Sequence, residues 1–89
     1  GTLTVDAGAR RALERGGTSL LFAGVVAVDG EFHAGDAVEI RDESGVVFAK
    51  GLVSVDVDVA RSRIGLSSSA LDEGSVAWLV HADDLVVLP

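Results

Sequence analysis

Apolar and polar residues alternate through the middle of the chain, and this pattern predicts β-strands there. Residues 37–41 and 46–50 both alternate with a period of two, and residues 42–45 between them, Asp-Glu-Ser-Gly, are typical of a tight turn. We therefore predict a β-hairpin over residues 37–50, with one face of each strand in the core.

Two more strands are predicted in the first third of the chain. Residues 3–5 are short and largely apolar, and a period-two pattern begins at residue 19 and continues to residue 28. The second of these strands is expected to turn at Asp29 and Gly30, which together favour turns, or just after them, with Phe32 continuing its apolar pattern.

The last third of the chain is predicted to close the sheet. Residues 76–81 and 85–88 are apolar and resemble two strands, separated by a turn at Asp83 and Asp84. Gly51 interrupts the returning strand of the central hairpin, and a glycine inside a strand indicates a bulge or a bend of a small barrel.

One principal helix is predicted near the start of the chain, over residues 7–15. Asp6 is placed to cap its first turn with a side-chain carboxylate, and Gly16 can adopt the left-handed conformation that ends a helix. Three residues recur at helical spacing on its apolar face: Ala9, Ala12 and Leu13.

A short second helix is predicted over residues 59–64. Either Asp56 or Asp58 could cap its start, and Gly65 would stop it. A polar loop follows, with a helical turn expected at 69–71. Short strands with one early helix and a second short one predict a mainly β fold, a partly closed barrel of mixed strands, because closure removes exposed sheet edges.

Composition narrows the class of protein. Eighty-nine residues fit a single domain spanning 1–89, and the lack of cysteine excludes disulfides and fits a cytoplasmic protein. No apolar run is long enough to span a bilayer. The chain contains no methionine, so we interpret it as a fragment of a longer protein. A net charge of −7 repels phosphate backbones and argues against RNA binding.

Four short segments together resemble a known family. They are LTVDAGA at 3–9, SLLFAGV at 19–25, FHAGD at 32–36 and HADDLV at 81–86, while residues 54–77 match more loosely. No segment is specific alone, but their order and spacing resemble a PUA domain, and most closely the C-terminal PUA domain of the bacterial glutamate 5-kinases. The resemblance implies a PUA-like pseudo-barrel.

The resemblance also implies a function. The parent enzyme would phosphorylate the side-chain carboxylate of glutamate with ATP and Mg²⁺, in the first step of proline biosynthesis, within a preceding amino-acid kinase domain. This chain would then be a non-catalytic accessory or regulatory domain with no cofactor of its own, whose partners are the kinase domain and other subunits of a homo-oligomer. The alternatives are an RNA-binding PUA domain of an RNA-modifying enzyme and a free-standing interaction module.

A candidate contact loop follows from the same resemblance. Its residues and the neighbouring basic ones are Ser19, Leu20, Leu21, Phe22, Gly24, Arg11 and Arg15. In RNA-binding members such a loop approaches a nucleic-acid backbone, whereas here Gly24 more simply serves a tight turn, in a backbone conformation that β-branched residues resist. Phe22 stands where this kinase family is expected to have proline; it is either a stacking platform or, as we favour, a partly buried anchor.

Other residues with chemical potential have simpler structural explanations. Arg10 is expected to pair with Glu14 four residues later, which leaves little of a phosphate-binding track on this helix. Lys50, Arg61 and Arg63 could extend the basic cluster only if folding brings them near it. No phosphate-binding loop is present in the sequence, because residues 16–19 lack its lysine and spacing.

The acidic and aromatic residues also have structural explanations. The pair Asp56 and Asp58 could hold a cation but supplies too few oxygen ligands, so helix capping is favoured. A general base or metal site at His81, Asp83 and Asp84 is set against a structural turn, which is favoured. His33 is expected at a surface turn and Trp78 in the core or an interface, so no catalytic or metal residue is assigned.

Overall fold

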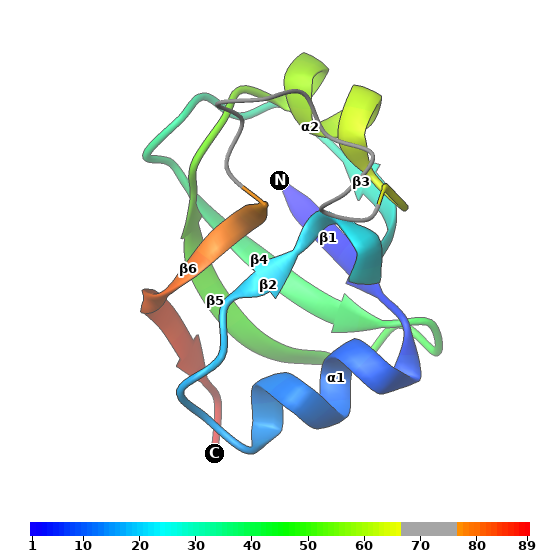
Figure 1. The fold of residues 1–89 in the computed structure, drawn as a ribbon, viewed down its shortest axis with the longest axis vertical. Coiled ribbons are helices and arrows are strands. Elements are labelled where there is room, and N and C mark those ends of the chain that lie inside the picture. Colours follow the sequence, from blue (N-terminus) through cyan, green and yellow to red (C-terminus); the bar gives the residue numbers. More distant parts are fainter. Residues whose placement is uncertain (67–76) are drawn as a thin grey trace.

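The computed structural model describes residues 1–66 and 77–89, and the helical turn predicted at 69–71 lies outside this part of the chain. The elements follow one another as β1 (Thr2–Val5), α1 (Ala7–Glu14), β2 (Leu20–Leu21), the 3₁₀ turn η1 (Phe22–Gly24), β3 (Val25–Asp29), β4 (Ala37–Asp42), β5 (Val47–Val53), α2 (Val57–Arg63) and β6 (Trp78–Val87). Figure 1 shows the strands curling around one another between the two helices.

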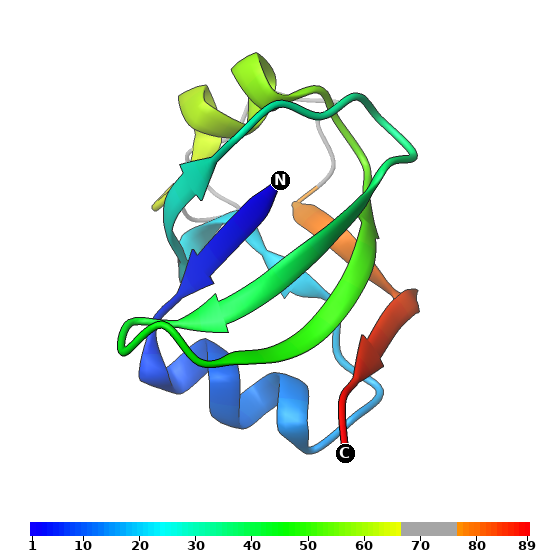
Figure 2. The same cartoon turned by 180° about the vertical axis from the view of Figure 1, so that it is seen from behind.

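The six strands form one mixed sheet in the order β2-β6-β5-β4-β1-β3. Strand β1 lies parallel to β4 and antiparallel to β3, and the remaining neighbours are antiparallel. Seen from behind in Figure 2, the sheet curls so that α1 covers one end and α2 lies at the other. The predicted architecture, mainly β with one principal helix and a short second one, is confirmed.

The core fills the inside of the curled sheet. Its largest fully buried side chains come from both halves of the chain: Leu3, Val5, Leu13, Leu20, Phe22, Val25, Ile40, Leu79 and Val80. Each fully buried side chain of this size contributes roughly 1.5–3 kcal/mol relative to an exposed one. Because these residues come from α1 as well as from the strands, the core packs the helix against the sheet.

Helix α1 begins and ends as the sequence predicts. The carboxylate of Asp6 accepts a hydrogen bond from the backbone N–H of Ala9 at 2.7 Å, which satisfies one of the free donors of the first turn. Leu13 on the apolar face is buried. At Gly16 the chain takes a φ of 82°, a left-handed conformation that ends helices and that glycine adopts without steric cost.

The central hairpin of β4 and β5 is confirmed as well. Its turn is held by Asp42, whose Oδ1 accepts hydrogen bonds from the backbone N–H groups of Ser44 and Val46 and from the Ser44 hydroxyl. Gly45 completes the turn with a φ of 93°. An aspartate at the start of such a turn is favoured because its side chain can accept bonds from the turn's own backbone.

The predicted turn at Asp83 and Asp84 is wrong. Residues 78–87 form one strand, β6, which pairs with β5 on both sides of the two aspartates. Gly51 pairs with Leu85 and Val53 with Val80, so two steps along β5 match five along β6, and the extra residues of β6 bulge out. Two acidic residues lie outside the core in a bulge just as they do in a turn. The sequence pattern alone therefore does not distinguish the two structures.

The glycine opposite this bulge has the role that its position predicts. A Cβ atom on Gly51 would lie 2.5 Å from a methyl carbon of Val80 and 3.0 Å from the carbonyl oxygen of Asp84. Only glycine allows the two backbones to approach this closely. The bulge that Gly51 was expected to mark is therefore confirmed.

The pattern between residues 19 and 28 hides a break. Instead of one strand, the structure has β2, the turn η1 and then β3, and it buries Val25 while leaving Val26 46% exposed. Gly30 makes the predicted turn with a φ of 81°, and the buried ring of Phe32 packs just beyond the strand. A short 3₁₀ turn between apolar residues leaves little trace in a period-two pattern.

Helix α2 begins two residues earlier than predicted and ends before Gly65, whose φ is 78°. Asp56 occupies the capping position, but its carboxylate accepts a bond from the backbone N–H of Ala34 at 2.8 Å and none from α2. Asp58 lies within the first turn and is exposed. The capping role predicted for this pair is therefore wrong: Asp56 holds the loop before β4 instead.

Candidate functional site

A groove of about 300 Å³ separates α1 from the segment of β2 and η1. Small residues of the helix, Gly8 and Ala12, line one side, and Leu20, Leu21 and Ala23 line the other. We call this hollow the α1–β2 groove. Its lining is largely apolar, so water gains little by occupying it and an apolar group would be favoured there.

Strand β6 fixes the wall that β2 contributes. Leu20 pairs with Val80 and Leu21 with Trp78, and the Ser19 hydroxyl accepts a hydrogen bond from the backbone N–H of Ala82 at 2.8 Å. These bonds hold a strand of only two residues at the sheet edge. The groove therefore has a wall that is anchored to the sheet rather than a free loop.

Phe22 belongs to the core and not to the surface of the groove. Its ring is fully buried, with 0% exposure, and its carbonyl oxygen accepts a bond from the N–H of Gly65. The guanidinium of Arg63 lies over the ring, 5.8 Å from its centre. A ring in this position has no free face for a nucleic-acid base, and it is buried more completely than the partly buried anchor that the sequence favours.

Gly24 lies at the end of the groove. Glycine is needed at this position for a different reason from the one expected. It is not among the glycines with positive φ, so its backbone conformation is open to other residues. A Cβ atom here would lie 2.7 Å from the Cβ of Ala9. The carbonyl oxygen of Gly24 also accepts a bond from the N–H of Asp6 at 3.0 Å, so η1 and the start of α1 are in direct contact.

The candidate residues that remain accessible lie on two sides of α1. Leu21 lines the groove, whereas Arg11 lines a separate hollow with Arg10 and Asp42. Leu21 is 45% exposed, and both Arg11 and Arg15 are exposed on α1. Arg15 lies seven positions after Gly8 and three after Ala12, so helical geometry puts it on the same side as the groove. Within residues 1–66 and 77–89, neither arginine forms a salt bridge.

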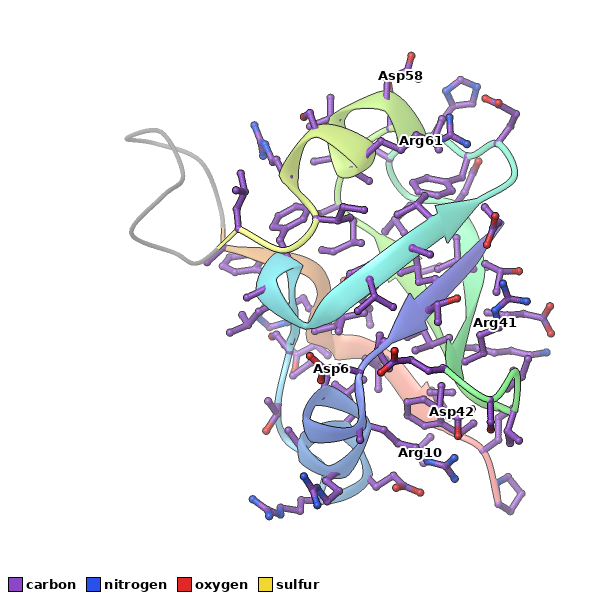
Figure 3. The ribbon with its side chains drawn as sticks, turned by 90° about the vertical axis from the view of Figure 1, so that its right-hand side faces the viewer. Asp6, Arg10, Arg41, Asp42, Asp58 and Arg61 are labelled. Carbon is purple, nitrogen blue, oxygen red and sulfur yellow. The ribbon has the colours of Figure 1, made fainter. Side chains whose placement is uncertain are left out.

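Arg10 lies on the opposite side of α1 and is held within the protein. Its guanidinium donates to Glu14 at 3.2 Å, as predicted, and to Asp42 at the end of β4. It also lies over the ring of Phe48, 5.0 Å from the ring centre. Figure 3 shows the side chains of Arg10 and Asp42 directed toward one another.

The bonds around Asp42 change its acidity. Donation from the Ser44 hydroxyl, together with the backbone N–H of Val46 and the guanidinium of Arg10, lowers the pKa of Asp42 to about 2 from an ordinary 3.8. The pKa of Arg10 is raised by its bonds to Glu14 and Asp42. Both groups are therefore ionised at neutral pH and form a stable link between helix and hairpin.

The other sequence candidates lie apart from the groove. Arg61 is at the opposite end of the molecule from Arg10 in Figure 3, so the two ends do not form one basic track. His33 is exposed beside Asp56, with 3.8 Å between its Nδ1 and the carboxylate. In the described residues, no three metal-binding side chains come together.

The closing segment carries a half-buried histidine. His81 Nδ1 accepts a bond from the backbone N–H of Asp83 at 3.1 Å, and its ring meets that of Trp78 edge-on at 5.1 Å between centres. His81 is half-buried and Asp83 is exposed, and both belong to the bulge of β6. Their contacts are local ones that shape the strand.

Comparison with known proteins identifies the family to which this fold belongs. Residues 1–76 match the family profile described as "PUA domain". The chain belongs to the PUA domain family. Neither helix in the described part of this PUA domain is long and apolar enough to cross a membrane.

Curated relatives of this PUA domain are glutamate 5-kinases. It is 44% identical over 88 residues to the glutamate 5-kinase of Mycobacterium tuberculosis H37Rv, and 48% identical over 92 residues to that of Streptomyces avermitilis. Each match covers 99% of this chain but only 23% and 24% of the relative. The PUA domain thus spans less than a quarter of the length of these enzymes.

Solved structures show the same fold. A conserved PUA domain protein from Thermoplasma acidophilum superposes with a TM-score of 0.64 at 23% identity, covering 91% of this chain and 48% of that one. A PUA domain from Aeropyrum pernix K1, solved as a tartrate complex, gives a TM-score of 0.65 at 30% identity, covering 92% and 42%. The predicted PUA-like pseudo-barrel is confirmed.

The sequence interpretation missed six of the nine residues that line the α1–β2 groove, among them Gly8, Ala12 and Ala23. Gly8 and Ala12 are four apart in a predicted helix, and this spacing of small residues was the available signal. The partnership of Arg10 with Asp42 was also missed, since the two residues are 32 positions apart.

Proposed function

We propose that this PUA domain is the C-terminal accessory domain of a glutamate 5-kinase. The observation that supports this most is identity of 44–48% along 99% of the chain to enzymes of that name. The parent would transfer a phosphoryl group from ATP, with Mg²⁺, to the side-chain carboxylate of glutamate in the first step of proline biosynthesis. It would do so in the cytoplasm.

The catalytic work is assigned to the adjoining amino-acid kinase domain, and residues 1–89 act as one domain through contact. Phosphoryl transfer needs groups that cradle phosphates and metal ions that neutralise developing charge. The accessible features of this domain are instead an apolar groove and a histidine held by its own strand. Contact with the kinase domain or a neighbouring subunit is the use that these features support.

The full-length parent tests this proposal. Asp84→Ala and His81→Ala should leave the rate of glutamate phosphorylation, followed as ADP release, near that of the unmodified enzyme. Deleting the domain should change assembly or the response to effectors while glutamate turnover persists. A folded Asp84→Ala enzyme without activity would refute an accessory role, and a parent without glutamate kinase activity would refute the assignment itself.

RNA binding is the alternative function. The net charge of −7 and the burial of Phe22 both argue against it, because the charge repels phosphates and the ring cannot stack on a base. The two exposed arginines of α1 are the feature that favours it. They are also the feature that a protein partner would use.

A further inference from the structure

The bulge of β6 is held by side chains as well as by the strand ladder. Residues 81–84 have no partner in the register of β5. Side chains accept bonds from two of their backbone N–H groups: Ala82 donates to the Ser19 hydroxyl at 2.8 Å, and Asp83 donates to Nδ1 of His81 at 3.1 Å. The shape of the bulge therefore depends on side chains that can accept hydrogen bonds.

A proton can remove one of these two acceptors. An imidazole nitrogen accepts a hydrogen bond only while its lone pair is free, so the bond from Asp83 requires Nδ1 of His81 to be unprotonated and the ring hydrogen to lie on Nε2. Histidine is the side chain whose charge ordinarily changes between about pH 5 and pH 8. The hydroxyl of Ser19, by contrast, keeps its lone pairs throughout this range. The bulge thus contains one contact that acid leaves intact and one that acid breaks.

A partner for the protonated ring is already nearby. A carboxylate oxygen of Asp83 lies 3.7 Å from Nδ1 of His81, too far for a hydrogen bond but within reach of a small rotation of either side chain. Asp83 is exposed, so its carboxylate has room to move. A protonated imidazole donates from both nitrogens and cannot accept from a backbone N–H. The charged ring would therefore turn from the N–H of Asp83 to the carboxylate of the same residue.

Few charged groups surround this ring within the described residues. On its own strand they are Asp83 and the next residue, Asp84. The elements that pack most against β6 are β5 and β2. Strand β5 has one lysine, Lys50, which pairs with Val86 beyond the bulge, and β2 is preceded by the uncharged hydroxyl of Ser19. The acidic partner of a charged ring is thus Asp83.

The single tryptophan of the chain lies against the same histidine. The rings of Trp78 and His81 meet edge-on, with 5.1 Å between their centres. Trp78 pairs with Leu21 of β2, and Ala82 binds Ser19, so His81 lies between the two contacts that anchor one wall of the groove. A rotation of the His81 ring would therefore change the surroundings of Trp78 next to this wall.

We propose that the β6 bulge is a proton-dependent switch with two hydrogen-bonded states. While His81 is neutral, its Nδ1 accepts from the backbone N–H of Asp83 and its ring contacts Trp78 edge-on. When a proton from water binds to Nδ1, the ring turns and donates to the Asp83 carboxylate, and the N–H of Asp83 is left to water. This switch goes beyond the accessory function proposed above and does not rest on it.

Nuclear magnetic resonance of the unmodified chain tests both states. At about pH 8, a scalar coupling through the hydrogen bond should join the amide nitrogen of Asp83 to Nδ1 of His81, with the ring hydrogen on Nε2. At about pH 5 this coupling should be lost, and the Asp83 amide proton should move upfield along the titration curve of the His81 ring. A ring hydrogen on Nδ1 at the higher pH overturns the proposal. An Asp83 amide shift that does not follow the His81 titration also overturns it.

Tryptophan fluorescence separates the switch from other effects of acid. The emission of Trp78 should change along the same curve in the unmodified chain. His81→Asn keeps an acceptor oxygen close to the position of Nδ1 but does not titrate, so its emission should stay constant over this range. His33→Asn is the matched control, because it removes the other histidine, and it should keep the full change.

The fluorescence results can also contradict the switch. An emission change that persists in His81→Asn, or one that disappears in His33→Asn, overturns the proposal. Circular dichroism at both pH values checks that each variant is folded. The resonance experiment needs no variant, so its outcome decides the proposal even where a substitution unfolds the chain.

Discussion

The guanidinium of Arg10 donates a hydrogen bond to the carboxylate of Asp42 and so joins the first helix to the end of β4. The same guanidinium lies over the Phe48 ring on β5. This bond crosses one side of α1, while the α1–β2 groove lies on the other. The central hairpin thus contacts α1 on the side opposite the groove.

We expect both partners of this bond to stabilise the domain. Arg10→Ala should lower the melting temperature, because it removes a charged hydrogen bond and the contact with Phe48. Asp42→Ala should lower it further, since Asp42 also holds the hairpin turn. Circular dichroism melts of both single variants and the double variant should show non-additive effects. Arg15→Ala is the matched control, and a similar loss there would contradict the prediction.

Acid should weaken the domain partly through Asp42. Its pKa is about 2 in the folded protein and near 3.8 ordinarily, so the ionised carboxylate stabilises the folded state fully above about pH 4. This contribution is lost as the pH falls toward 2. Between those two values the melting temperature should fall more steeply for the unmodified chain than for Asp42→Asn. Parallel curves for the two proteins would show that Asp42 does not carry the effect.

Loss of the α1 cap should also be measurable. Asp6→Ala removes the bond to the N–H of Ala9, and a lost cap typically costs about 1 kcal/mol. For a domain of this length, that corresponds to a fall in melting temperature of about 4–8 °C. Asp58→Ala is the control, because Asp58 is exposed in the first turn of α2, and it should melt close to the unmodified chain.

Two glycines of the groove should respond in opposite directions. Gly24→Val forces a side chain against Ala9, and overpacking of this kind costs about 1–3 kcal/mol of unfolding free energy. Gly8→Ala meets only Asp6 at an ordinary distance and should stabilise the helix by about 0.5–1 kcal/mol. Urea unfolding of both variants measures the difference. A stable Gly24→Val variant would show that η1 can move away from α1.

RNA binding by the domain should be weak. At a net charge of −7, we expect a Kd for transfer RNA of about 10⁻⁴ M or weaker at physiological salt, which is the non-specific range. Replacing Arg11 and Arg15 by alanine should change this value little. A gel shift with micromolar affinity and a steep salt dependence would instead favour the RNA-binding alternative.

Features that depend on neighbours in the sequence were predictable. Asp6 and Gly16 define the two ends of α1 through residues within one helical turn, and Asp42 begins a turn that closes four residues later. Local signals of this kind are read directly from residue type and spacing. The resemblance carried by four short segments then extended them to the fold and the family.

Features that depend on residues far apart in the sequence were not predictable. The two aspartates of β6 resemble a turn in the sequence, and only the pairing of Gly51 with Leu85 makes them part of a bulge. Gly24 was expected to need a special backbone conformation, but its constraint is contact with Ala9 on another element. The groove itself arises where α1 meets β2, and no short window of sequence contains both surfaces.

The dependence of β2 on β6 orders the events of protein synthesis. Residues 20–21 leave the ribosome 57 residues before Trp78, the first residue of their partner strand. At about 5–20 residues per second, that is an interval of roughly 3 to 12 seconds. During it α1 and the central hairpin can form, but the second wall of the groove has no strand to pair with. The β2 wall of the groove is therefore among the last parts of the nascent domain to form.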